Sequence, residues 1–337
     1  MNIAFRADAS ESIGIGHLIR CLALAEELKN KNHSCFFVTK IQNKDLIERI
    51  EKNHKHLQIN PNANLEQDNK ELLNFSNQNK IDWIITDHYD INSEYIQKLK
   101  NKNYNVLSID DNAIISYHSD IVLNQNIGAE KLKYSNEEYT KFLLGPKYAL
   151  IRNQLLVRDK KTQRSSVKKI LIMLGGTDEG NIILKIIKSI KEIKDVEFLV
   201  IIGPLNPHYN ELKKYIDSKK LNVKLIRSPE NLADFYLDSD IAISAGGSSC
   251  YEFSYFGIPN IIITLAKNQV KSAKELGRQK ISIYIGDIQK IDFNNLRKKL
   301  KELISNSSIR NTMSKNGKKL VDGKGKERTI DFMERFN

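Results

Sequence analysis

The sequence opens with IAFRAD at residues 3–8 and, after a short polar loop, continues with GIGHLIR at residues 14–20. The first segment predicts a buried β-strand, and the second predicts the first turns of an α-helix. Glycines at such a turn let the backbone approach a ligand closely, and the free N–H groups of a helix start favour an anion. His17 would lie beside a bound phosphate and can titrate near neutral pH. The glycine spacing differs from the dinucleotide-binding motif GxGxxG, so this turn alone does not define a function.

Strands and helices alternate from residue 1 to about residue 152. Apolar runs predict strands at residues 3–8, 34–39, 81–87, 106–111 and 121–124, the last of which closes this half. Helices are predicted at residues 17–28, 44–52 and 93–102, whereas residues 53–80 are assigned no element. Residues 145–152 read as a connector, and the charged residues 158–164 as a solvated linker or loop.

The second half repeats this alternation. Strands are predicted at residues 169–174, 196–202, 223–227, 241–244 and 260–265. Helices are predicted at residues 181–193, 209–219 and 230–237, around Glu252 and after residue 269, and short helices finish the chain, the last at residues 327–336. Near-continuously apolar strands separated by helices imply parallel sheets covered on both faces.

This pattern predicts an α/β protein made of two facing, Rossmann-like, doubly wound domains, the architecture called GT-B. We expect an N-terminal domain at residues 1–152, a C-terminal domain at residues 153–320, and a final helix at residues 321–337 that packs back on the first domain. Ligands of open parallel sheets bind at the carboxyl ends of the strands. Both domains would then present those ends to a shared cleft.

Composition and charge restrict the class of protein. The 337 residues are 40% hydrophobic and 28% charged, as in ordinary globular proteins. The longest apolar run, around residues 196–205, is far shorter than the roughly 18 to 20 residues of a membrane span, and Arg6 and Asp8 interrupt the only apolar stretch at the N-terminus, which argues against a signal peptide. The net charge of +12 comes from lysines spread along helices without interleaved aromatic residues. We therefore expect a cytoplasmic monomer with an acidic small-molecule substrate and no nucleic-acid partner.

Several kinds of chemistry lack their motifs. Cys21, Cys35 and Cys250 show no CxxC spacing, so we expect reduced, mostly buried thiols and no zinc. The motifs GxSxG, HExxH and GxxxxGK[ST] are absent, which removes the main support for a serine hydrolase, a zinc protease or a P-loop protein. No DxD follows a strand, so we expect neither a metal nor a cofactor.

Two glycine turns follow strands of the second half. Gly175, Gly176 and Thr177 could cradle a phosphate with backbone N–H groups and a hydroxyl, or form a tight turn that requires a positive φ. The second turn contains Gly246, Gly247 and Ser248. The glutamate behind it, Glu252, could accept both hydroxyls of a ribose, or be a surface residue favoured by the helix dipole. Two such turns in one domain favour a site for a nucleoside diphosphate.

Polar side chains also follow two other strands. Asn268 and Gln269 could bind sugar hydroxyls or acetamido groups, or cap the next helix. His88 and Tyr89 end a strand of the first domain and would face the same cleft as His17. For His88 alone, a simple hydrogen-bonded histidine at a strand end is the commoner case.

Seven segments together resemble one family. They are FRADAS at 5–10, IGIGH at 13–17, DHY at 87–89, IDD at 109–111, YALIR at 148–152, MLGGTD at 173–178 and KNQ at 267–269. In this order they resemble the UDP-2,4-diacetamido-2,4,6-trideoxy-β-L-altropyranose hydrolases of pseudaminic acid biosynthesis. The resemblance extends from residue 1 to about residue 275, and the region from about residue 281 resembles the closing helices of MurG-type transferases.

The resemblance implies a GT-B enzyme that needs no metal and cleaves the sugar from UDP with water and with inversion at the anomeric carbon, in a pathway that supplies surface glycans such as those of flagellin. It places the catalytic base at His17 and a residue that orients sugar or water at Tyr89. Positive helix ends at Gly176–Thr177 and Gly247–Ser248 would stabilise the leaving diphosphate. The substrate-binding residues would be Asp8, Gly14, Gly16, Arg20, His88, Asn268 and Gln269. The UDP-binding residues would be Gly175, Gly176, Thr177, Gly246, Gly247, Ser248 and Glu252.

Three alternatives stay open. The pair Gly246–Gly247 departs from the family pattern, so the substrate could be another nucleotide-linked deoxy sugar, as in the hydrolase/2-epimerase of legionaminic acid synthesis. A GT-B glycosyltransferase would use the same UDP-sugar as a donor. A module that binds nucleotide sugars without catalysis would retain its binding when His17 is replaced.

Overall fold

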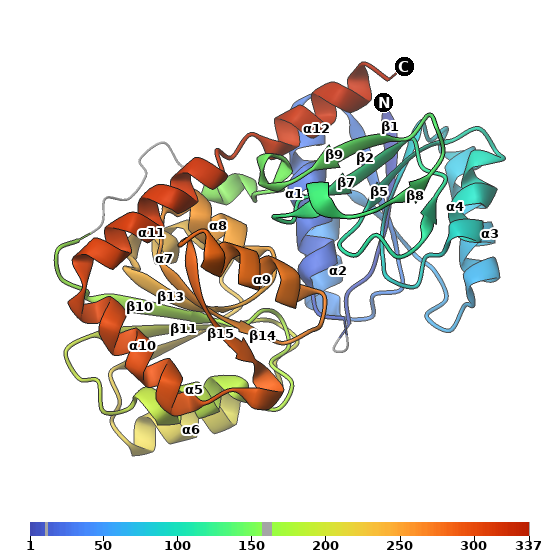
Figure 1. The fold of residues 1–337 in the computed structure, drawn as a ribbon. Helices are drawn as coiled ribbons and strands as arrows, with labels where there is room; N and C mark the ends of the chain where they lie inside the picture. Colours follow the sequence, from blue (N-terminus) through green and yellow to red (C-terminus); the bar gives the residue numbers. More distant parts are fainter. Residues whose placement is uncertain (11–12, 157–163, 337) are drawn as a thin grey trace. The chain divides into compact units, whose positions relative to one another are not determined.

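The computed structural model describes residues 1–10, 13–156 and 164–336 and divides the chain into two compact units (Figure 1). Unit 1 contains Met1–Asn153 together with Lys324–Asn337, and unit 2 contains Gln154–Gly323. The linker expected at residues 158–164 lies outside the described residues except for its last residue.

Unit 1 is built on a parallel sheet with the strand order β3-β2-β1-β4-β5-β7-β9. The strands are β1 (Asn2–Ala7), β2 (Ser34–Thr39), β3 (Lys55–Gln58), β4 (Trp83–Asp87), β5 (Asn105–Ile109), β7 (Ile121–Asn124) and β9 (Lys141–Leu144). A separate pair consists of β6 (Ser116–Tyr117) and β8 (Ser135–Asn136). The expectation that residues 121–124 close this half is wrong, because β9 adds a further strand beside β7.

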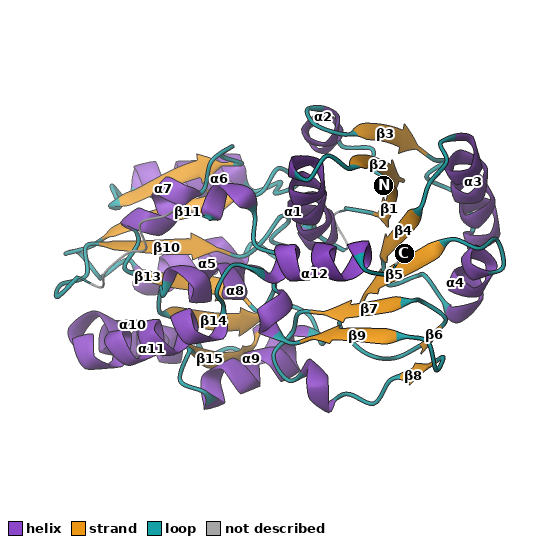
Figure 2. Cartoon of the chain, turned by 90° about the horizontal axis from the view of Figure 1, so that it is seen from above, coloured by secondary structure: helices purple, strands orange, loops and turns teal. Residues whose placement is uncertain are grey.

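Helices cover both faces of this sheet. They are α1 (Gly16–Asn30), α2 (Lys44–Glu51), α3 (Leu65–Gln78), α4 (Ser93–Lys100) and α12 (Gly325–Glu334), with short 3-10 turns η1 (Ala129–Lys131) and η2 (Pro146–Tyr148), and η3 (Asn153–Leu155) at the boundary of the units. Figure 2 shows α1 and α12 on one face and α3 and α4 on the other. Asn43, Asn64 and Asn92 begin three of these helices by accepting a backbone N–H three residues later, as asparagine does at an N-cap.

Unit 2 has a six-stranded parallel sheet with the order β12-β11-β10-β13-β14-β15. Its strands are β10 (Lys169–Met173), β11 (Glu197–Ile202), β12 (Val223–Arg227), β13 (Ile241–Ala245), β14 (Asn260–Thr264) and β15 (Ser282–Asp287). The expectation that only helices follow residue 281 is wrong. The edge strand β15 is mostly half-buried and carries an irregularity opposite Ile262 and Ile263, so its apolar pattern is weak.

The helices of unit 2 are α5 (Ile182–Ile190), α6 (Tyr209–Ser218), α7 (Ala233–Asp238), α8 (Ser249–Phe256), α9 (Gln269–Arg278), α10 (Phe293–Ser305) and α11 (Ser307–Leu320), with the turn η4 (Ile288–Lys290). In Figure 1, α5 and α6 lie on one face of the sheet and α7, α8 and α9 on the other. Among the helices described, none is both long and apolar enough to cross a membrane.

The strand order places the polar segments of each unit. Chain connections reverse direction between β1 and β4 in unit 1 and between β10 and β13 in unit 2. Ligands of doubly wound sheets bind outside the carboxyl ends of the strands at this point. Buried apolar side chains lie on both faces of each sheet. Cys21, Cys35 and Cys250 are buried, as expected from the sequence.

Candidate functional site

His17 lies in the first turn of α1 and is buried, with 6% of its surface exposed. Its ring meets the ring of Tyr89 edge-on, with centroids 4.5 Å apart. Burial lowers the pKa of His17, although the charges of Asp87 and Asp111 act in the opposite direction. Its Nδ1 atom is buried and has no hydrogen-bond partner within the described part of the chain. The imidazole is therefore neutral at neutral pH and can accept a proton.

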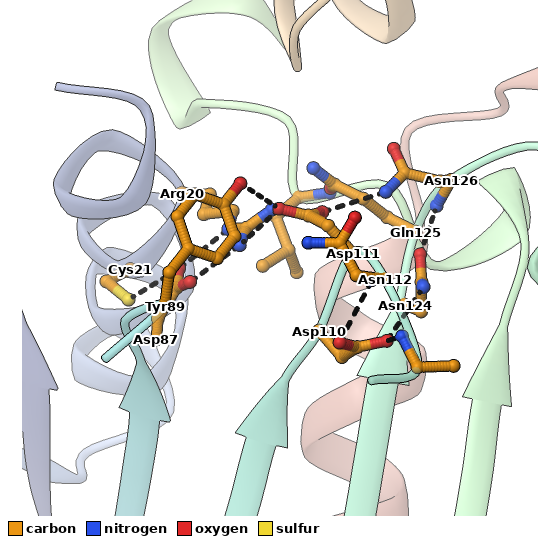
Figure 3. A network of polar contacts seen from close by, with 12 residues as sticks. Arg20, Cys21, Asp87, Tyr89, Asp110, Asp111, Asn112, Asn124, Gln125 and Asn126 are labelled. Carbon is orange, nitrogen blue, oxygen red and sulfur yellow. Dashed lines mark hydrogen bonds and ion pairs between the residues drawn. The ribbon is translucent and has the colours of Figure 1, made fainter. Parts of the chain in front are cut away.

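Arg20, one turn further along α1, is the centre of a buried polar network (Figure 3). Its Nε and Nη2 atoms donate to the two carboxylate oxygens of Asp87, both at 2.6 Å. Its Nη1 and Nη2 atoms donate to Asp111 at 2.9 and 3.2 Å. The guanidinium is thus occupied by two carboxylates, which come from the loops and strand ends that follow the sheet core. Contact of Arg20 with substrate stays a prediction. Its observed hydrogen bonds hold the carboxylates of Asp87 and Asp111 in place.

Asp111 connects this network to the aromatic ring beside His17. It accepts the hydroxyl of Tyr89 and the side-chain amide of Asn126, each at 2.8 Å. Burial by itself would raise the pKa of Asp111, but the charge and hydrogen bonds of Arg20 hold it well below its usual range. Asp111 is therefore ionised, and it fixes the hydroxyl end of the Tyr89 ring.

Asp8 and His88 belong to a neighbouring buried cluster. Asp8 accepts Nη2 of Arg6 at 2.7 Å and the backbone N–H of Lys40 at 2.6 Å. Nδ1 of His88 accepts the backbone N–H of Asp90 at 3.0 Å, which leaves its proton on Nε2, 3.5 Å from Asp8. Asp8 and His88 hold the ends of β1 and β4 in place, and their contact with substrate stays a prediction.

Gly14 and Gly16, in the loop before α1 and at its start, differ in backbone conformation. Gly14 has a φ of +75° and pairs with Ser10 through two backbone hydrogen bonds of 2.9 and 3.3 Å. Gly16 lacks a positive φ, and a Cβ atom there would meet nothing within 4 Å of the described chain. Packing within the described chain therefore does not require a glycine at position 16. Close approach of a ligand would require one.

The first glycine turn of unit 2 differs from its expectation. Gly175 has a φ of +101°, and the backbone of Gly176 packs so closely that a Cβ atom on Gly203 would lie 2.4 Å from its Cα. Helix α5 begins only at Ile182, and Asp178 accepts the N–H groups of Ile182 and Ile183. The expected positive helix end at Gly176–Thr177 is wrong, because the helix starts later and a carboxylate caps it. Binding of UDP by Gly175, Gly176 and Thr177 stays a prediction.

Asp178 is itself unusual. Burial raises its pKa to about 6, against the effect of the hydrogen bonds from the backbone of α5. This carboxylate satisfies the first N–H groups of the helix, as an N-cap does, and those groups are not available to a phosphate.

The second glycine turn lies directly at a helix start. Gly246, Gly247 and Ser248 precede α8, and the side chain of Ser248 makes no capping hydrogen bond. Gly247 has no positive φ, and a Cβ atom there would meet nothing within 4 Å. The first turn of α8 therefore presents backbone N–H groups beside Gly247, where the absence of a side chain leaves room for a ligand.

Gln269 joins this turn to the end of β14. Its Oε1 atom accepts the backbone N–H of Leu265 at 2.9 Å and that of Gly246 at 3.3 Å. Its neighbour Asn268 occupies the N-cap position of α9, but its side chain does not cap the helix. Gln269 thus braces two strand-end loops, and the contacts of both amides with substrate stay predictions.

Glu252 is buried in α8, with 4% of its surface exposed. Its Oε2 atom accepts the hydroxyl of Tyr236 at 2.8 Å. The alternative of an exposed surface glutamate is therefore wrong. Its role as a ribose ligand stays a prediction.

Sequence reasoning gave no individual role to Asp87, Asp111 or Asn126. Asp87 and Asp111 occurred only inside the segments DHY and IDD. A detectable signal was present, since carboxylates follow two successive buried strands and an arginine lies on the helix after β1. Among the residues described, no three His, Cys, Asp or Glu side chains are grouped so that they could hold a metal ion.

Comparison with known proteins identifies relatives across the whole chain. Residues 170–328 match the glycosyltransferase family 28 C-terminal domain. The spore coat polysaccharide biosynthesis protein SpsG of Bacillus subtilis is 26% identical over 331 residues, which cover 96% of this chain and 95% of that protein. The UDP-2,4-diacetamido-2,4,6-trideoxy-beta-L-altropyranose hydrolase of Campylobacter jejuni is 28% identical over 284 residues, covering 83% of this chain and 97% of that protein.

The fold is also that of a solved structure. The crystal structure of MurG from Acinetobacter baumannii superimposes with a TM-score of 0.70 at 14% sequence identity and covers 99% of each chain. This similarity shows the GT-B fold and confirms the fold class expected from the sequence. The chain therefore has the GT-B fold, and its sequence is similar to a UDP-2,4-diacetamido-2,4,6-trideoxy-β-L-altropyranose hydrolase and, in its second half, to the glycosyltransferase family 28 C-terminal domain.

Proposed function

We propose that this protein is a hydrolase that cleaves a UDP-sugar into UDP and the free sugar 2,4-diacetamido-2,4,6-trideoxy-L-altrose. The name of the Campylobacter relative, which aligns with 83% of this chain, supports this substrate. The observation that carries the proposal is the buried His17, whose lowered pKa keeps its ring neutral beside Tyr89.

His17 acts as the general base in this proposal. A water oxygen forms a bond to the anomeric carbon while the bond from that carbon to the diphosphate oxygen breaks. The electron pair of the broken bond leaves with UDP, and the proton of the water passes to a ring nitrogen of His17. Attack opposite the leaving group inverts the anomeric configuration. UDP is a good leaving group, so no general acid is required.

The carboxylates near His17 are poorly suited to that role. Asp87 accepts two hydrogen bonds from Arg20, and Asp111 accepts four from Arg20, Tyr89 and Asn126. The low pKa of Asp111 makes it a weak base, whereas a neutral imidazole has a proton affinity suited to neutral pH. Tyr89 is the residue that orients sugar or water, because its hydroxyl is held by Asp111 and its ring meets His17.

Unit 2 binds the UDP portion. The start of α8 at Gly247 and Ser248 stabilises the charge that develops on the diphosphate, since a helix start offers backbone N–H groups and a positive dipole end. Glu252 holds the ribose, and Asn268 and Gln269 hold the sugar or phosphate. The reaction in this proposal uses no metal or cofactor.

The test is hydrolysis of UDP-2,4-diacetamido-2,4,6-trideoxy-β-L-altropyranose in ¹⁸O-labelled water, without an acceptor and with EDTA. Anomeric NMR signals should show free sugar of inverted configuration, and mass spectrometry should find the label in the sugar. His17→Leu should lower kcat by roughly 100-fold or more, the usual contribution of a general base. His208→Leu, a half-buried histidine of unit 2, serves as the control and should leave kcat within about twofold. Label in UDP, or full activity of His17→Leu, would contradict the mechanism.

A glycosyltransferase is the second candidate, favoured by the match of residues 170–328 to the glycosyltransferase family 28 C-terminal domain. It would bind the same UDP-sugar but release no free sugar without an acceptor. Binding of intact substrate without hydrolysis would therefore favour the transferase over the hydrolase.

A further inference from the structure

A small pocket of unit 1 opens at the carboxyl ends of β4 and β5. It is formed by residues that follow the two strands and by the loop between β5 and β6. The side chains around its mouth and walls include His88, Tyr89, Ile91, Asn112, Ile114 and Ile115. Tyr89 and Asp111 belong both to this pocket and to the network around His17.

Two large hydrophobic side chains of this pocket, Ile114 and Tyr89, are exposed. Ile114 is 75% exposed and Tyr89 is 44% exposed. Within the described chain only one other large hydrophobic side chain, Tyr139, is exposed to this degree. Two of three such residues thus meet at one pocket, whereas single exposed apolar residues are normally scattered. Behind them, Ile91 and Tyr117 are buried and continue the apolar wall.

The polar groups of the pocket are mostly engaged with one another. Asp110 accepts the backbone N–H groups of Asn112 and Ala113 and the hydroxyl of Tyr117. It also accepts the amide of Asn124 and the hydroxyl of Tyr134. Since Asp111 is likewise saturated by four donors, neither carboxylate has an oxygen left without partners.

Asn112 is the exception. Its backbone N–H donates to Asp110, but its side-chain amide has no hydrogen-bond partner among the described residues. An uncharged amide can donate to a carbonyl oxygen and accept from an N–H. The pocket therefore combines apolar walls with one neutral hydrogen-bonding group.

We propose that this pocket binds an N-acyl group of the sugar, with its methyl against Ile114 and Ile115 and its amide on Asn112. The inference rests on the proposed function, because it assigns a part of that substrate. Tyr89 supplies the connection: its ring contacts His17 and also lines the pocket, so a substituent in the pocket belongs to the sugar ring that is presented to His17. A hydroxyl would leave the apolar wall uncovered, and an ammonium would lie against that wall without an acceptor of its own.

A binding experiment tests the location. Saturation-transfer NMR uses intact UDP-2,4-diacetamido-2,4,6-trideoxy-β-L-altropyranose with the His17→Leu protein, and the uracil protons serve as the internal reference. An acetamido methyl should receive strong saturation. Asn112→Ala and Ile114→Ser should each weaken that signal relative to uracil, whereas Asn74→Ala, on the exposed face of α3, should not. Methyl saturation that neither pocket variant changes would overturn the inference. Absence of uracil saturation would overturn the proposed function, and the inference with it.

A kinetic experiment tests the chemistry. Two analogues each carry a free amine in place of one acetamido group. In the wild type, one analogue should lose about 20-fold in kcat/KM, from about fourfold for a buried methyl and about fivefold for a neutral hydrogen bond. In the Asn112→Ala/Ile114→Ser double variant this selectivity should fall to within about threefold, while Asn74→Ala retains it. An amine analogue that both enzymes process better than the substrate would show that the charge of Asp110 selects a cation, and would overturn the inference.

Discussion

Replacing Asp111 by asparagine would test the network that holds Tyr89 against His17. The carboxylate accepts four hydrogen bonds, from Arg20 at 2.9 and 3.2 Å and from Tyr89 and Asn126 at 2.8 Å each. Asparagine keeps the shape of the side chain, but one oxygen becomes an NH₂ group. Because all partners are donors, at least one of them would then face another donor.

The expected cost follows from these contacts. Removing one partner of a buried ion pair costs about 3–5 kcal/mol. Arg20 retains both hydrogen bonds to Asp87, and the amide oxygen can still accept, so we expect the lower end, about 3 kcal/mol of the free energy of unfolding. The pKa of Asp111 is lower in the folded state than in the unfolded state. Its stabilisation is therefore fully present above the unfolded pKa of about 3.9 and is lost as the pH falls below that value.

Urea unfolding measures this cost. Trp83, the only tryptophan, is fully buried in β4 of unit 1, so its fluorescence reports the unit that contains Asp111. Asp111→Asn should lower the free energy of unfolding at pH 7, and the difference from the wild type should shrink below about pH 4. The control Tyr89→Phe removes one donor and should cost about 1 kcal/mol. A cost for Asp111→Asn below that of the control, or one that is the same at pH 7 and pH 3, would refute the reasoning.

Asp111→Asn should also change the pH dependence of kcat/KM. The charge of Asp111 raises the pKa of His17, while burial lowers it. Without that charge the pKa of His17 should fall further, so the acid limb of kcat/KM should move to lower pH. An acid limb that stays in place, or moves to higher pH, would show that Asp111 does not act on His17 electrostatically.

Four other substitutions test a ligand contact at Gly247, the packing of Gly203, the hydrogen bonds of Gln269 and the pKa of Lys326. Gly247→Ala should change the free energy of unfolding by less than about 0.5 kcal/mol but weaken UDP binding in calorimetry by roughly tenfold, because its Cβ would enter space that only a ligand fills. Gly203→Ala should cost about 2 kcal/mol or more in urea unfolding, because its Cβ would lie 2.4 Å from the Cα of Gly176. Gln269→Ala should cost about 2 kcal/mol in the same assay, because two backbone N–H groups lose their shared acceptor. Burial lowers the pKa of Lys326 to about 8, so the wild type should gain roughly 1.4 kcal/mol per pH unit over Lys326→Met between about pH 8 and pH 10, and a flat difference across this range would contradict that pKa.

Most of the fold was predictable because buried strands are local apolar runs. Strands β2 and β7 coincide with their predictions at residues 34–39 and 121–124. The missed elements β3, β9 and β15 are edge strands with half-exposed residues, so their patterns are weak. Helix α3 was missed because it contains several Asn, Asp and Ser residues, which have low helix propensity. It forms because Asn64 and Gln67 cap its start reciprocally and because Leu72 packs into the core.

The sequence also predicted where chemistry-bearing residues lie along the chain. His17, Tyr89, Gly175 and Gly247 all follow the carboxyl ends of strands, which is a local property of alternating strands and helices. Gly175 has the positive φ that a tight turn requires, which confirms one of the two alternatives for this segment. The helix that follows begins at Ile182, close to its predicted start at residue 181, so residues 178–181 separate it from the helix end expected at Gly176–Thr177.

The sequence by itself determined the alternation of strands and helices, the polar turns at the strand ends and the absence of familiar hydrolase and metal motifs. Only the tertiary structure decided the partners of the charged side chains. Arg20 pairs with Asp87 and Asp111, which lie 67 and 91 residues further along the chain. These pairings require β1, β4 and β5 to lie side by side in register, and buried charges are tolerated only when such a partner is present. The order of strands in a sheet is set by packing between distant segments, so no local pattern in the sequence could specify it.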